Sequence, residues 1–157
     1  MKLAEALIER AALVTKFQEL KERILRNATV QEGEKPAEDP KELLDEARGV
    51  LANLGLLIVN INKTNTLTDV TTVGGTVSLT SALAYRDTLR MRHNLLRETV
   101  EAATGERGFR LTRAEIKQLP ALDVSAVQKE ADEVAKKLRD LEVAIQQANW
   151  ETELLTQ

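Results

Sequence analysis

The sequence contains no cysteine, which excludes disulfides, thiolate metal ligands and a cysteine nucleophile. Phenylalanine, tryptophan and tyrosine make up only 3% of its 157 residues. The hydrophobic core must therefore be built from leucine, isoleucine, valine and alanine. His93 is the single histidine, so a single-chain zinc catalytic site lacks ligands. Arg90 stands where a di-iron Glu-x-x-His motif ending at His93 would have its glutamate.

Long apolar runs and an excess of positive charge are also missing. No uninterrupted apolar stretch approaches the ~20 residues of a membrane-spanning helix. Glu5 and Glu9 interrupt the N-terminal segment where a signal peptide would be apolar, so we expect a cytoplasmic protein. The net charge is −3, whereas nucleic-acid-binding domains are usually basic. We predict no nucleic-acid partner, no cofactor and no enzymatic activity.

Charged residues make up 30% of the sequence and hydrophobic residues 43%, a balance typical of long amphipathic helices. Apolar residues recur every three or four positions in four segments, which predicts helices over residues 2–28, 40–65, 79–104 and 123–149. The second has the strongest start signal, because Asp39 is placed to cap it and Pro40 follows. Asp123 is expected to cap the fourth helix. Thr112 and Glu115 form a capping box for a short helix in between.

The four predicted helices are similar in length, about 26 residues or roughly 39 Å each at 1.5 Å per residue. Matched lengths suit an antiparallel bundle. The predicted fold is therefore all-α, with four long antiparallel helices forming a bundle in a single domain over residues 1–157. The short link after the first helix predicts a helical hairpin. The order of the helices around the bundle stays open.

Residues 67–80 break the helical pattern. They are rich in threonine and valine around Gly74 and Gly75, which predicts a short β-hairpin between the second and third helices. A lone hairpin is marginal in water, so it needs to pack on a helix or on another subunit. We therefore expect this hairpin to be a contact in assembly.

Three polar residues occupy seam positions that an ordinary bundle fills with leucine: Arg10 on the first helix, and Arg86 and His93 on the third. Arg90 and Arg97 follow at helical spacing, so Arg86, Arg90, His93 and Arg97 line one face of the third helix. Two interpretations follow. The first is a layer of salt bridges that fixes helix register and oligomeric state. The second is an anion pocket, because guanidinium groups bind carboxylate or phosphate in a bidentate way. We favour the first, and we expect the histidine to be structural because no nucleophile stands at a diagnostic spacing.

The order of several segments resembles the septicolysin-like family, a group of small bacterial proteins without a settled biochemical activity. The resemblance covers nearly the whole chain. It rests on residues 2–10 (KLAEALIER), 27–40 (NATVQEGEKPAEDP), 61–65 (INKTN), 86–93 (RDTLRMRH) and 128–154, which end in QANWETEL. The family name implies a pore-forming cytolysin. It implies no catalytic or lipid-binding residues in this sequence.

The leading functional hypothesis is a non-enzymatic, self-associating cytosolic helical protein, a homo-oligomer whose extra apolar surface beside each seam needs a partner. The alternative is the cytolysin implied by the resemblance, under which a membrane becomes a partner. The hairpin arms of about 6–7 residues are shorter than the ~9–11 of a membrane-spanning strand. A further alternative is anion or RNA binding through the arginine-rich third helix, since seryl-tRNA synthetases present similar long charged helical arms.

Overall fold

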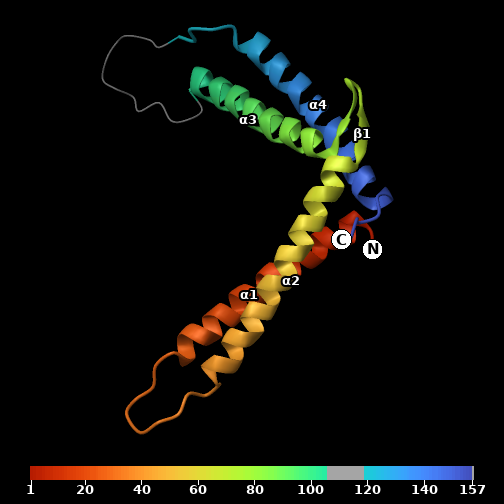
Figure 1. Cartoon of the computed structure of the whole chain (residues 1–157). Coiled ribbons are helices and arrows are strands. Elements are labelled where there is room, and N and C mark those ends of the chain that lie inside the picture. The colour runs from red at the N-terminus through yellow and green to blue at the C-terminus, as the bar shows by residue number, and fades with distance from the viewer. Residues whose placement is uncertain (106–118, 157) are drawn as a thin grey trace, which may run out of the picture. The chain divides into compact units, whose positions relative to one another are not determined.

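The computed structural model describes residues 1–105 and 119–156. Its elements, in chain order, are α1 (Leu3–Asn27), α2 (Pro40–Leu67), β1 (Asp69–Thr72), β2 (Gly75–Ser78), α3 (Leu79–Thr104) and α4 (Val124–Glu151) (Figure 1). The prediction of four long helices with a short β-hairpin between the second and third is confirmed. The short helix predicted around Thr112 and Glu115 lies outside the described residues.

The predicted start signals fold as the capping rules require. The Asp39 carboxylate accepts a hydrogen bond from the backbone N–H of Lys41 at 2.8 Å, with Pro40 as the first residue of α2. The Asp123 carboxylate accepts one from the N–H of Ala126 at 3.1 Å. Each bond satisfies a backbone donor that has no partner within its helix. Helix α3 is capped at its C-terminal end by Gly105, which adopts a left-handed conformation with φ of 76°.

Helix α2 continues two residues beyond its predicted end at residue 65. Asparagines near that end predict a stop, but threonines among them bond to the helix instead. The Thr64 hydroxyl donates to the carbonyl of Asn60 at 2.8 Å, and the Thr66 hydroxyl donates to that of Asn62 at 2.9 Å. These side-chain bonds lie along the helix and do not compete with it here, so the backbone ladder continues to Leu67.

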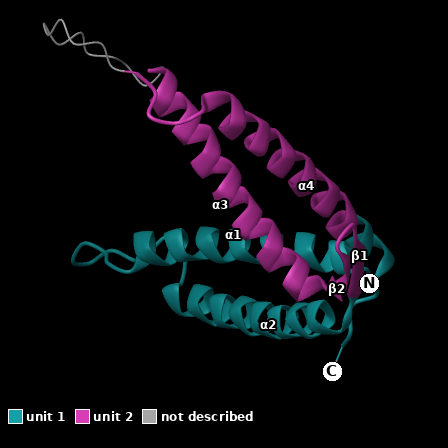
Figure 2. Ribbon diagram, turned by 90° about the horizontal axis from the view of Figure 1, so that it is seen from above, with its two compact units in different colours: residues 1–68, 147–157 teal, residues 69–146 magenta. Residues whose placement is uncertain are grey.

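The described chain divides into two compact units: residues 1–68 with 147–157, and residues 69–146 (Figure 2). The first unit contains α1, α2 and the C-terminal end of α4. The second contains the β-hairpin, α3 and most of α4. The single domain expected over residues 1–157 stays a prediction.

In the first unit, α1 and α2 lie side by side as an antiparallel helical hairpin. Its core consists of buried side chains from both helices, flanked by half-buried ones on α1. The buried set is Leu20, Leu43, Ala47 and Val50, and the flanking set is Leu13, Phe17 and Ile24. All seven occupy the heptad seams that predict these helices, so the aliphatic seam forms the helix contact as expected.

The first and last described segments of the chain meet in this unit. Lys2 and Glu153 form an isolated antiparallel β-bridge, and the N–H of Leu3 donates to the carbonyl of Thr152 at 2.9 Å. The N–H of Leu155 donates to the Thr64 hydroxyl at 3.0 Å. Because Thr64 is fully buried, this bond fastens the C-terminal segment to α2.

In the second unit, β1 and β2 pair antiparallel, with Asp69 opposite Ser78 and Thr72 opposite Gly75. The predicted turn lay at the Gly-Gly pair, but the residues between the strands are Val73 and Gly74. Gly75 is the first residue of β2 and has a φ of 115°, a conformation that a residue with a Cβ rarely adopts. The strands have four residues each, shorter than the predicted arms.

Candidate functional site

The predicted arginines of α3 each pair with a separate carboxylate. Arg86 donates to its neighbour Asp87, with Nη2 and Nε at 2.8 and 2.9 Å from Oδ1. Arg90 reaches across to Glu142 on α4, with Nε 3.2 Å from Oε1. Arg97 lies 3.8 Å from the carboxylate of Glu101, one helical turn further along α3. The side chains do not share one anion-sized site.

The two remaining predicted residues behave differently. Arg10 occupies a seam position of α1 but is exposed, whereas neighbouring seam positions such as Ala6 and Leu13 are buried or half-buried. Its long side chain therefore leaves the helix contact. His93 is half-buried on α3, and none of the hydrogen bonds or ion pairs found among the described residues involves it.

Other acidic side chains of α1 and α2 pair with residues outside this set of arginines. Glu46 pairs with Lys16 across α1 and α2, at 2.8 Å. Asp45 pairs with Arg48 on its own helix, at 2.6 Å. The Glu5 carboxylate accepts from the backbone N–H of Lys2 at the start of α1, at 2.6 Å.

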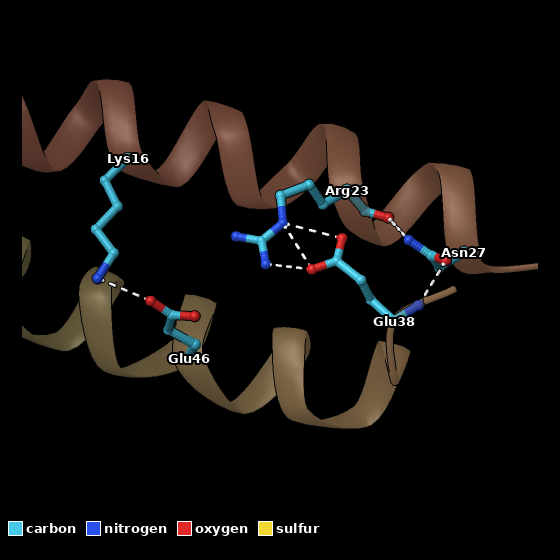
Figure 3. Close-up of polar contacts among 5 residues, drawn as sticks. All are labelled: Lys16, Arg23, Asn27, Glu38 and Glu46. Atoms are coloured by element: carbon cyan, nitrogen blue, oxygen red, sulfur yellow. Dashed lines mark hydrogen bonds and ion pairs between the residues drawn. The ribbon is translucent and has the colours of Figure 1, made fainter. Parts of the chain in front are cut away.

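Two further ion pairs join different elements through arginines that the sequence analysis does not single out. Arg92 on α3 donates to Glu130 on α4, with Nη2 2.6 Å from Oε1. Arg23 on α1 forms a bidentate pair with Glu38 just before α2 (Figure 3), with Nε 3.1 and 3.2 Å from the two carboxylate oxygens. Asn27 completes this second arrangement: its side chain donates to the Arg23 carbonyl and accepts from the Glu38 N–H. The only sequence signal was the presence of opposite charges, which does not specify a pair.

These pairs shift the ionisation of their acidic members. The hydrogen bond from Arg23 holds the pKa of Glu38 below its ordinary value, and the hydrogen bond from Lys16 does the same to the pKa of Glu46. The pKa of Arg23 is raised, chiefly by its bond to Glu38. All of these side chains are partly solvent-exposed, so each pair contributes little to stability.

The second unit carries an open groove of about 720 Å³ between the hairpin and the two helices. Its apolar lining includes Tyr85, Leu89 and Leu141, and charged side chains of both signs stand among the lining residues, for example Glu133 and Lys136. The volume suits a small ligand. However, no buried set of polar groups converges on the groove, so we assign no chemistry to it.

The middle of α2 combines a lack of charge with several exposed apolar side chains. No charged residue lies between Arg48 and Lys63. Four large apolar side chains of this stretch face solvent, with exposed fractions of 45% for Leu51, 63% for Leu56, 37% for Ile58 and 48% for Val59. We call residues 49–62 the uncharged segment.

Both glycines of the uncharged segment, Gly49 and Gly55, face open space, because a Cβ added to either would meet nothing within 4 Å. Their lack of a side chain is therefore not required for packing of α2 against α1.

Within residues 1–105 and 119–156, no group of three or more histidine or acidic side chains is placed to hold a metal ion. None of the helices, within those same residues, has the length and apolarity needed to cross a membrane.

Comparison with known proteins reveals relatives whose function is also unknown. A solved structure from Corynebacterium diphtheriae, of a functionally unknown conserved protein, shares 38% sequence identity with this chain, and the match covers 99% of both chains with a TM-score of 0.90. No curated protein matches the sequence. A family of unknown function, DUF6847, matches residues 10–154. This match spans most of the sequence, and the chain therefore belongs to the family of unknown function DUF6847.

Proposed function

We propose that this protein is a non-enzymatic helical protein that self-associates, and that the uncharged segment of α2 is the contact between copies. One observation carries the proposal: residues 49–62 expose Leu51, Leu56, Ile58 and Val59 and contain no charge. A surface helix normally has one apolar stripe and a charged opposite face. Here the face packed against α1 is apolar, and the faces away from it carry exposed apolar side chains and no charge.

Leaving such an apolar surface in water costs free energy. Burying apolar surface contributes roughly 25 cal/mol per Å², and contiguous exposed apolar patches on soluble proteins generally mark interaction sites. The rest of the protein carries a net charge of −3, which opposes association of copies elsewhere. The uncharged segment adds no like-charge repulsion. It is therefore the surface on which two copies can meet with the smallest electrostatic cost.

The predicted role of the β-hairpin in assembly is the competing contact. Val70 is buried, which leaves Val73 at the turn, 96% exposed, as the large apolar side chain that the hairpin presents most fully. A single side chain offers less apolar area than the α2 surface. We therefore place the contact on α2 and keep the hairpin as a second test position.

The cytolysin alternative rests on the resemblance to septicolysin-like proteins. It requires a membrane-active segment, and the strands of the hairpin have four residues each where spanning strands need about 9–11. Release of a trapped dye from liposomes across several lipid compositions would support this alternative. Retention of the dye in all of them would remove it.

The anion and RNA alternative places a ligand on the arginines of α3. Arg86, Arg90 and Arg97 already have carboxylate partners, which a phosphate would have to displace. This favours a register role over a binding role. A rise in melting temperature on addition of phosphate, or salt-sensitive binding of RNA, would reverse that preference.

The direct test of self-association is the molar mass in solution, measured by light scattering on a size-exclusion column. We expect a mass above the 17.4 kDa of one chain. The variant Leu56→Lys should shift the protein to the monomer, because it places a charge on the contact.

Leu95→Lys is the matched control, since Leu95 on α3 is 65% exposed, close to the 63% of Leu56, and lies outside the proposed contact. It should retain the mass of the unmodified protein. A monomer for the unmodified chain at every concentration would overturn the proposal, and dissociation by Leu95→Lys alone would move the contact to α3. Val73→Lys tests the hairpin in the same way.

A further inference from the structure

Helix α2 carries a second heptad seam on the face that points away from α1. Six exposed residues recur at alternating spacings of four and three: Asp45, Gly49, Ala52, Leu56, Val59 and Lys63. We call them the outer seam. The buried residues of α2 are Leu43, Ala47, Val50, Leu57, Ile61 and Thr64. At 3.6 residues per turn, the outer seam lies on the side opposite the centre of this buried set.

The outer seam is complementary to itself when reversed. Asp45 and Lys63, Gly49 and Val59, and Ala52 and Leu56 are three pairs of positions symmetric about position 54. The outermost pair joins an acid to a base. Each inner pair joins a small residue to a large one.

This symmetry fits two antiparallel copies of α2 related by a two-fold axis near position 54. In that arrangement each member of a pair faces the other member on the second copy. The side chain of Leu56 then fills the space above Ala52, and that of Val59 fills the space above Gly49. Alternation of large and small side chains across a helix contact gives the interdigitated packing of protein cores.

A parallel arrangement of the same seam would be poor. It would place Asp45 opposite Asp45 and Lys63 opposite Lys63, which repel each other. Gly49 would face Gly49 and Ala52 would face Ala52, which leaves voids beside the larger Leu56 and Val59 layers. Voids destabilise a contact. The sequence of the outer seam therefore selects the antiparallel direction.

The charges at the ends of the seam are available for this pairing. No ion pair of Lys63 is found among the described residues, and it is exposed. Asp45 bonds Arg48 on its own helix, but both side chains are largely exposed, at 73% and 72%. A carboxylate with two oxygens accepts a second cation without losing the first.

We infer that two copies of this chain associate through the outer seam of α2 in antiparallel orientation, with Asp45 of each copy beside Lys63 of the other. This inference rests on the proposed self-association and names its geometry. Gly49 and Ala52 let the helix axes approach to about 8 Å, the close end of the usual range. The seam is about 28 Å long, counted at 1.5 Å per residue.

Paired cysteine substitutions test the geometry, and the absence of native cysteine makes their products unambiguous. The two variants are Gly49→Cys and Val59→Cys. The first adds a side chain into open space, and the second replaces the two methyl groups of an exposed side chain with one sulfur. Each is purified alone, and the two are then mixed and oxidised with diamide.

In the antiparallel arrangement only the mixture forms a covalent dimer efficiently. Residue 49 of one copy faces residue 59 of the other, whereas two copies of position 49 lie about 15 Å apart along the axis. A disulfide requires Cα atoms within about 7 Å, so the mixture should yield on the order of tenfold more covalent dimer than either variant alone. Efficient dimerisation of each variant alone, with none gained on mixing, indicates the parallel arrangement and overturns the inference.

Charge reversal at the two ends of the outer seam tests the same orientation independently, because it leaves the packing residues between them unchanged. Asp45→Lys and Lys63→Asp each place like charges together at both ends of the contact. Each should raise the dissociation constant of the dimer about three- to tenfold. The double variant restores opposite charges and should return the constant to within about twofold of the original.

The outcomes separate this inference from the proposed function. A chain that stays monomeric in light scattering overturns both. A dimer that is insensitive to charge reversal, or that shows no excess of covalent product in the cysteine mixture, retains self-association and overturns the antiparallel α2 contact. If a cysteine variant alone loses the dimer, the charge-reversal series decides.

Discussion

Truncation of Leu20 probes the contact on which the first unit is built. Leu20 is 1% exposed and packs with Leu43, Ala47 and Val50. Leu20→Ala removes three carbon groups, which at about 0.8 kcal/mol per buried methylene is about 2.4 kcal/mol. The cavity adds to this, because leucine-to-alanine changes in cores cost about 2–5 kcal/mol.

Leu20→Ala should fall in the lower half of that range. The flanking Leu13, Phe17 and Ile24 are only half-buried, so they are free to move inward and fill part of the cavity. We therefore expect a loss of about 3 kcal/mol in the free energy of unfolding. Urea titration followed by helical circular dichroism, at one fixed protein concentration, measures it.

Leu25→Ala is the matched control, since Leu25 lies on the same helix but is 65% exposed. It should change the free energy of unfolding by less than about 0.5 kcal/mol, as surface substitutions usually do. Equal losses for the two variants, or a loss below about 1 kcal/mol for Leu20→Ala, would refute the packing of α1 on α2 described above.

Three further predictions follow from particular contacts. Thr64→Val removes the hydroxyl that fastens the C-terminal segment, and it should cost about 1 kcal/mol and speed amide exchange in that segment; unchanged exchange would contradict it. The pKa values of Glu38, Glu46 and Glu153 are lowered from 4.5 by hydrogen bonds from their basic partners, so their stabilisation is complete above pH 4.5 and is lost as pH falls through the lowered pKa values. The urea midpoint of unfolding should fall as the pH is lowered through that window, and it should fall less steeply for Glu38→Gln. Gly55→Ala should stabilise α2 by up to about 1 kcal/mol, because the new methyl group meets open space, and a lower melting temperature would contradict this.

The helix boundaries could be predicted from sequence because their signals are local. Asp39 followed by Pro40 predicts the start of α2, and both residues act as predicted. The end of α2 was placed two residues early. Asparagines near position 65 indicate a stop, but the back-bonding of Thr64 and Thr66 depends on rotamers that composition does not reveal.

The ion pairs could not be predicted because they depend on the register between segments distant in sequence. Arg90 pairs with Glu142 and Arg92 with Glu130, and no spacing within α3 specifies either partner. Glu46 pairs with Lys16 across α1 and α2, and this partner likewise depends on how the two helices align.

The exposure of α2 also needed the structure. Leu51 and Ile58 lie beside the heptad seam of α2, and the sequence alone does not say whether such residues pack within the chain or face solvent. In the structure both are exposed, together with Leu56 and Val59. A helical hairpin has only two layers, so the apolar surface beyond one shared face has no partner within it.

The molar mass of the unmodified protein, measured by sedimentation equilibrium from micromolar to millimolar concentration, decides whether two copies associate. We expect the mass to rise to twice the 17.4 kDa of one chain, and we expect Leu56→Lys to return it to the mass of one chain. A mass of one chain throughout would contradict the proposed self-association.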